Sequence, residues 1–157
     1  MSLPPSRMKD KLIEQLEKAY QRLIQALDRI PDNQKIYDNW TKKELIAHII
    51  GWYEEGVVGT PKILKGEKPD SFRITINNYN KRSVEKRRKM TLSKVKKEMA
   101  DLHKKWLEQI KSLDEDQIIG FYGTLLGKKP INVEWMINEG ISHDNAHSEE
   151  LEKMDKN

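Results

Sequence analysis

WTKKELIAHIIGWYEEG, residues 40–56, combines a helix start signal with a helical spacing of apolar side chains. Thr41 and Glu44 stand three residues apart, as in a capping box, and Trp40 can pack on Leu45 across the first turn. His48 lies on the same face as the apolar positions Leu45, Ile49 and Trp52. The stretch therefore predicts an amphipathic helix that begins at Thr41 and carries a histidine on its inner face.

Three further segments show the same spacing of apolar residues. The first segment, residues 8–30, ends before Pro31, and the second, residues 91–113, begins with Thr91 as N-cap. The third is residues 132–154. Four long amphipathic helices without a strong strand pattern predict an all-α four-helix bundle. The side chains expected to be buried together are Leu16, Leu23, Leu45, Ile49, Leu102, Trp106, Met136 and Ile137.

A long connection is expected between the second and third of these helices. Gly56 and Pro61 are expected to end the second helix, which leaves residues 57–80 as a connection too long for a simple turn. Within and after it, residues 77–90 favour a short helix, and residues 113–131 favour a loop with a small hairpin. Residues 57–80 are therefore either a rim or lid over a site or a surface loop that contacts nothing.

Length and composition limit the class of protein. At 157 residues, the chain is expected to form a single domain, residues 1–157. It has no cysteine, so a metal site would need histidine, aspartate or glutamate ligands. No apolar stretch reaches the length of a membrane span, and the N-terminus lacks the apolar middle of a signal peptide. We therefore expect a cytoplasmic protein without a membrane partner.

The charge pattern favours no nucleic-acid partner. Lysine and arginine number 29 against 25 acidic residues, a net charge of only +4. The most basic run, KRSVEKRRK at residues 81–89, includes Glu85 and no aromatic residue. This run is therefore interpreted as an exposed helix face.

Two of the four histidines lie four residues apart in GISHDNAHSEEL, residues 140–151. On a helix, His143 and His147 share one face, and His48 lies on the inner face of a neighbouring helix. Two ring nitrogens at this spacing and a third from another helix can bind one divalent ion and leave one position open. The alternative is that each is a hydrogen-bonded core residue. His103 has no partner at this spacing and is interpreted as structural.

Residues 40–56 also resemble the W-S/T-x-K/R-D/E-L-x-A-H-L/I-x-x-W segment of the DinB-like superfamily. The continuation is similar to one branch, the ClbS/DfsB four-helix bundle family, in which a glycine-containing loop precedes N-x-x-N/I-x-x-R. INNYNKRSVEKRR, residues 76–88, matches that stretch. The likeness extends from Trp40 to Leu151 and implies an up-down-down-up bundle.

The resemblance implies a metal site as well. In DinB-like proteins, one histidine of the second helix and an H-x-x-x-H pair of the last helix bind zinc or nickel, which implies His48, His143 and His147 here. Many ClbS/DfsB members have only the first histidine of the pair, in an S-H-Y-x-x-A ending. SHDNAH, residues 142–147, keeps both. This chain is therefore expected to be competent to bind a divalent metal.

Other side chains close to the three histidines are candidates for contact with a ligand. Trp52, Tyr53 and Asp144 are the expected pocket residues, although burial alone would also explain the two aromatic rings. A carboxylate within a turn of the site could support a histidine or act as a general base, although most helix carboxylates are merely solvated. These carboxylates are Glu54, Glu55, Glu139 and Asp144.

Two classes of function fit these features. The resemblance implies small-molecule detoxification or resistance, by a metal-dependent hydrolase or thiol transferase that generates a nucleophile near neutral pH. The alternative is a non-catalytic protein that binds a small molecule, or a helical interaction protein, without a metal. The expected partner is a small molecule, and a homodimer is left open. A wet, metal-loaded cavity would favour the enzyme, and a dry bundle centre would favour the binder.

Overall fold

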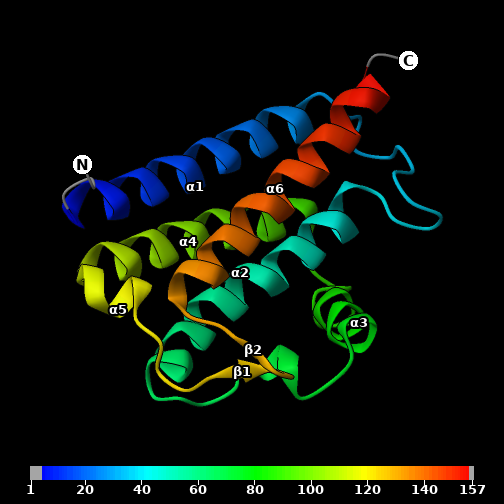
Figure 1. Cartoon of the computed structure of the whole chain (residues 1–157). Coiled ribbons are helices and arrows are strands. Elements are labelled where there is room, and N and C mark those ends of the chain that lie inside the picture. Colours follow the sequence, from blue (N-terminus) through cyan, green and yellow to red (C-terminus); the bar gives the residue numbers. More distant parts are fainter. Residues whose placement is uncertain (1–4, 156–157) are drawn as a thin grey trace.

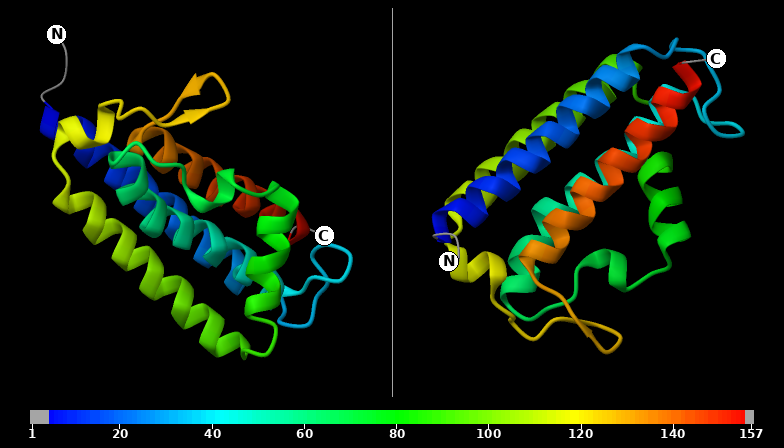
Figure 2. Two further views of the ribbon diagram at one scale, coloured as in Figure 1. Left: turned by 90° about the horizontal axis from the view of Figure 1, so that it is seen from below. Right: turned by 45° about the horizontal axis from the view of Figure 1, so that its top comes forward.

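The computed structural model describes residues 5–155, which form a bundle of four long helices (Figure 1). These helices are α1 (Pro5–Asp28), α2 (Lys42–Leu64), α4 (Leu92–Ser112) and α6 (Val133–Asp155). α1 and α6 run in one direction, and α2 and α4 run in the other (Figures 1 and 2). The expected all-α fold with up-down-down-up topology is confirmed.

The remaining elements lie outside the four long helices (Figure 1). The expected short helix between α2 and α4 and the expected hairpin are both present. The turn of the hairpin has Gly127 at a positive φ of 63°, which a glycine adopts without strain. These elements are η1 (Asp70–Phe72), α3 (Ile76–Lys86), α5 (Glu115–Ile119), β1 (Leu125–Leu126) and β2 (Lys129–Pro130).

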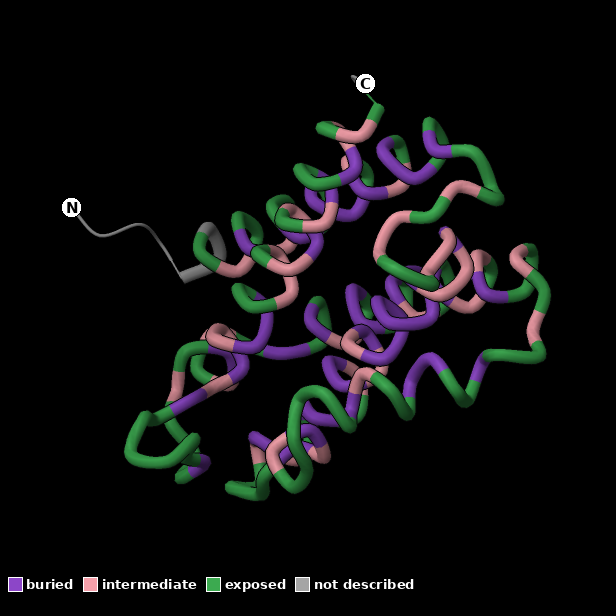
Figure 3. Tube along the Cα trace, turned by 90° about the vertical axis from the view of Figure 1, so that its right-hand side faces the viewer, coloured by how far each residue is buried: buried purple, intermediate pink, exposed green. Residues whose placement is uncertain are grey.

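The core lies where the inner faces of the four long helices meet. α1 packs chiefly on α6 and α2 chiefly on α4, and contacts of α2 with α6 and of α1 with α4 close the ring. Buried residues recur as stripes along these helices, whereas the hairpin is mostly exposed (Figure 3). Seven of the eight expected core residues are buried, namely Leu16, Leu23, Leu45, Ile49, Trp106, Met136 and Ile137.

Leu102 is the exception among the expected core residues, because it is only partly buried. The inner position on this turn of α4 belongs to His103, which is 4% exposed. Its ring stacks on Tyr20 of α1 at a centroid distance of 3.6 Å. The buried face of α4 at this turn is thus centred on His103 rather than on Leu102.

The start of α2 follows the sequence signal, but its end does not. The carboxylate of Glu44 accepts hydrogen bonds from the N–H of Thr41 at 3.0 Å and from its hydroxyl at 2.8 Å. The helix then continues past Gly56 to Leu64. A Cβ on Gly56 would lie 2.5 Å from the indole of Trp106. Gly56 therefore permits close packing of α4 on α2 rather than ending the helix.

Pro61 also lies inside α2, where it removes one backbone donor. The carbonyl that loses its partner belongs to Val57, four residues earlier. It accepts a hydrogen bond from the side-chain amide of Gln109 on α4 at 2.9 Å. The neighbouring helix replaces the lost hydrogen bond, and the connection to α3 is shortened to residues 65–75.

Candidate metal centre and adjoining cavity

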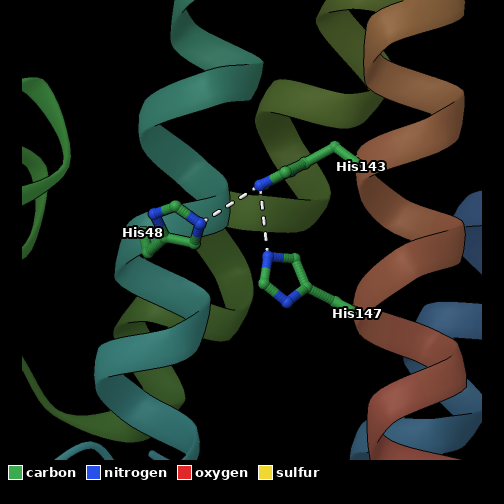
Figure 4. A group of neighbouring side chains, drawn as sticks. All are labelled: His48, His143 and His147. Carbon is green, nitrogen blue, oxygen red and sulfur yellow. Dashed lines mark hydrogen bonds between the residues drawn. The ribbon is translucent and has the colours of Figure 1, made fainter. Parts of the chain in front are cut away.

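Three histidines from two helices converge where α2 packs on α6 (Figure 4). The Nε2 atom of His143 lies 3.1 Å from Nε2 of His48 and 3.1 Å from Nε2 of His147. One ligand atom from each of the three residues lies within 4.8 Å of the other two. The structure therefore brings together the three residues that the sequence placed on two inner helix faces.

Burial favours the neutral form of these imidazoles. Loss of hydration lowers the pKa of His48 to about 4 and that of His143 to about 3, and repulsion from His147 lowers both further. Burial also lowers the pKa of His147. A neutral imidazole presents a free lone pair, which is the form that binds a metal ion. Three imidazole nitrogens are a suitable donor set for zinc or nickel.

Tyr37 supports the cluster from outside. Its hydroxyl lies 3.1 Å from Nδ1 of His147, and a carboxylate oxygen of Glu150 lies 3.8 Å from the same nitrogen. When Nδ1 of His147 carries the proton and donates it to the Tyr37 hydroxyl oxygen, Nε2 is unprotonated. Its lone pair is then directed toward the other two histidines. Tyr37 lies in the segment between α1 and α2, where no periodic pattern could have singled it out.

A cavity of about 640 Å³ lies beside His143. Its walls come from α2, α4 and α6, from the segment at residues 71–76, and from the hairpin. Sites for small molecules commonly have volumes of roughly 300–1,000 Å³. The segment between α2 and α3 thus borders the cavity, as a rim would, whereas its action as a lid stays a prediction. The principal lining residues are Trp52, Phe72, Ile76, Leu126, Trp135 and His143.

Of the three expected pocket residues, Trp52 lines this cavity, with its indole N–H bonded to the side-chain oxygen of Asn80 at 2.8 Å. Tyr53 and Asp144 are directed into the core, where the Tyr53 hydroxyl donates to the Asp144 carboxylate at 2.7 Å. They are 1% and 0% exposed. Successive helix residues point about 100° apart, which separates Tyr53 from Trp52.

The four carboxylates near the site have separate surroundings. Glu55 and Glu139 line the cavity. Glu54 instead forms an ion pair with the guanidinium of Arg87 at 2.8 Å. Burial raises the pKa of Asp144 to about 7. Sequence spacing alone could not separate these four positions, because all lie within two turns of a histidine.

In chelator-treated protein, the free energy of unfolding should fall as the solution is acidified. Between the ordinary pKa of 6.5 and the folded values of about 4 for His48 and His103 and about 3 for His143, the unfolded chain binds protons that the folded chain does not. Each such histidine contributes up to about 1.4 kcal/mol per pH unit. His147 acts in the same direction.

Asp144 opposes this effect, because burial raises its pKa from 3.8 to about 7. Between these two values the folded chain binds a proton at Asp144 that the unfolded chain does not, so this group stabilises the fold on acidification. Four histidines outweigh one carboxyl group. Urea unfolding from about pH 7 to about pH 4 measures the balance. Stability that rises on acidification would show that the histidines are not held neutral.

The fold and the cluster together define a class: a helical bundle whose second and last long helices supply three converging histidines. The chain belongs to the DinB superfamily, whose family model matches residues 15–151. The superfamily resemblance of residues 40–56 is thereby confirmed. No curated protein matches the chain. Among the described residues, no helix has both the length and the apolar character needed to cross a membrane.

Solved structures share this fold across nearly the whole chain. DfsB, described as a sibling lethal factor precursor, has a TM-score of 0.75 at 17% identity and covers 94% of this chain and 95% of its own. The colibactin self-resistance protein ClbS has a TM-score of 0.75 at 15% identity, with 95% and 96% covered. A Streptococcus pneumoniae protein has a TM-score of 0.78 at 17% identity, with 94% and 90% covered. At these identities, the similarity establishes the fold alone.

The expectation of no nucleic-acid partner is wrong. ClbS, which shares this fold, is solved in complex with a double-stranded DNA. The expectation relied on the net charge of +4, which averages over the whole surface. Contacts to phosphates depend instead on local groups of lysine and arginine. A small net charge is therefore no ground for excluding DNA.

Proposed function

We propose that this chain is a detoxification or resistance protein that holds a divalent metal at His48, His143 and His147 and acts on a small molecule in the adjoining cavity. The reaction class is hydrolysis or thiol transfer to an electrophile. The observation that carries the proposal is the convergence of three Nε2 atoms beside a cavity that His143 lines. Membership of the DinB superfamily and the fold shared with a self-resistance protein support it.

A divalent ion bound by three imidazoles supplies Lewis-acid activation of a nucleophile near neutral pH. The chain's own residues prepare the site for it. Tyr37 orients the ring of His147, and burial keeps the imidazoles unprotonated. Trp52, which is held by Asn80, forms an apolar wall that keeps bulk water from the bound molecule.

Turnover assays test the proposed function. Protein loaded with zinc or nickel is tested for hydrolysis of 4-nitrophenyl acetate and for transfer of cysteine or glutathione to 1-chloro-2,4-dinitrobenzene. We expect metal-dependent turnover in at least one assay, lost in His143→Ala and retained in His103→Ala. Turnover that does not depend on the metal or on His143 would contradict the proposal. Uptake of a ligand without turnover would favour the alternative of a binding protein.

A further inference from the structure

Glu55 is a buried carboxylate in the wall of the cavity, at 5% exposure. One of its oxygens accepts a hydrogen bond from the backbone N–H of Ser71 at 2.5 Å. Among residues 8–155, whose side chains the structure describes, no lysine, arginine or histidine forms an ion pair with it. Removing a carboxylate from water is costly unless a cation or several hydrogen bonds compensate. The carboxylate of Glu55 thus lacks a cationic partner among these residues, and a cation on a ligand could reach it through the cavity.

The surroundings of Glu55 suit an organic cation. The cavity wall holds the aromatic rings of Trp52, Phe72 and Trp135, and Phe72 and Trp135 pack edge to face with centroids 6.0 Å apart. Aromatic faces attract ammonium groups and also pack against apolar bodies. At the rim, Ile76 and Leu126 are 63% and 44% exposed, which leaves apolar surface for a ligand to cover.

The other charged groups of the lining also favour a cation. Glu139 is a second carboxylate, on α6, and Lys129 is the one ammonium, on the hairpin. Two carboxylates against one ammonium leave the lining with a net negative charge.

Helix geometry sets the reach of the ligand. His48, Trp52 and Glu55 follow one another along one face of α2 at intervals of four and three residues. Seven residues at 1.5 Å each separate His48 from Glu55 by about 10 Å along the axis. A single small molecule can therefore contact Glu55 at one end and reach the histidine cluster with the other.

We propose that the cavity binds a small molecule in which a protonated amine is joined to an apolar, preferably aromatic, body, and that Glu55 pairs with the ammonium. The apolar body packs on the aromatic lining. That this molecule is also the substrate rests on the proposed function, whereas its binding does not require a metal.

Three probes of nearly equal shape test the charge preference in chelator-treated protein. They are 1-naphthylmethylamine (cationic), 1-naphthylmethanol (neutral) and 1-naphthylacetate (anionic), and affinities are measured by NMR titration of the indole N–H signals. We expect the amine to bind at least about tenfold more tightly than the alcohol, with the acetate weakest. The signals of Trp52 and Trp135, assigned with Trp52→Phe and Trp135→Phe, should shift.

Variants then assign the preference to Glu55. Glu55→Gln keeps an oxygen for the Ser71 N–H, so we expect it to stay folded and to lose about tenfold in amine affinity with little change for the alcohol. Lys129→Gln removes the opposing ammonium from an exposed hairpin and should tighten amine binding. Glu17→Gln removes an equal charge from the exposed face of α1, a helix that does not line the cavity, and should change nothing.

Equal affinity for the three probes, or unchanged amine affinity in Glu55→Gln, would overturn this proposal. Metal content is measured separately on the same preparations. Amine binding by a chain that takes up no metal would leave the cavity assignment intact and reject the proposed metal-dependent function. Metal uptake without an amine preference would reject the ligand class alone.

Discussion

His143→Ala is expected to abolish stoichiometric metal binding. Its Nε2 is the nitrogen that lies 3.1 Å from Nε2 of both other ligands, so its loss leaves only His48 on α2 and His147 on α6. Removing an outer-shell partner of a metal ligand costs about 10–100-fold in affinity, so removing the ligand itself should cost more than about 100-fold. Zinc titration calorimetry and elemental analysis of protein purified without a metal-affinity tag measure this loss.

His103→Ala is the matched control for that experiment. His103 is a buried histidine, and burial lowers its pKa to about 4, but it stacks on Tyr20 in the core and lies outside the cluster. Its replacement should leave metal content unchanged, while chelator should remove the metal from the control and the wild type alike. An equal loss of bound metal in His103→Ala and His143→Ala would refute the site. So would less than about 0.1 metal ion per wild-type chain after addition of zinc or nickel.

The largest effect on stability is expected for Trp106→Ala. The indole is 1% exposed and passes between α2 and α6 at two glycines. A Cβ on Gly56 would lie 2.5 Å from the ring, and a Cβ on Gly140 would lie 2.7 Å from it. Truncation of a buried tryptophan to alanine costs about 3–5 kcal/mol. Urea unfolding followed by circular dichroism gives the free energy without relying on tryptophan fluorescence.

The glycines provide an internal check on this assignment. In the wild type, Gly56→Ala should cost about 1–3 kcal/mol, because the added methyl group displaces the indole. In the Trp106→Ala background, the same methyl group enters the space that the ring has left, so its cost should become small. Additive effects of Gly56→Ala and Trp106→Ala would show that the glycine does not accommodate the ring.

The helices and the histidine spacing could be predicted because they depend on residues close together in the chain. The bond between Thr41 and Glu44 spans three residues, and an i,i+4 pair such as His143 and His147 shares a face in any α-helix. The inner stripes place His48 toward the same interior once four helices are expected. The superfamily resemblance adds the direction in which the helices run.

The predicted end of α2 and the exclusion of a nucleic-acid partner were wrong because both depend on how residues are arranged in space. Gly56 reads as a helix end when only its neighbours in sequence are considered, but it is the contact point for Trp106, fifty residues further along the chain. Likewise, Pro61 is tolerated because Gln109 bonds the carbonyl of Val57. Charge summed over 157 residues says nothing of where basic groups lie on the surface.

The sequence by itself determined that there are four long helices and that three histidines face one interior, since periodicity and capping are properties of neighbouring residues. It did not determine where α2 ends or that residues 115–119 form the short helix α5. Only the tertiary structure decided that Tyr37 contacts His147, that Tyr53 and Asp144 bond in the core, and that Glu55 lies in the wall of a cavity. Each of these depends on a distance between residues remote in the chain. Such distances are set by how whole helices pack, and close packing of side chains, rather than any local preference, selects that arrangement.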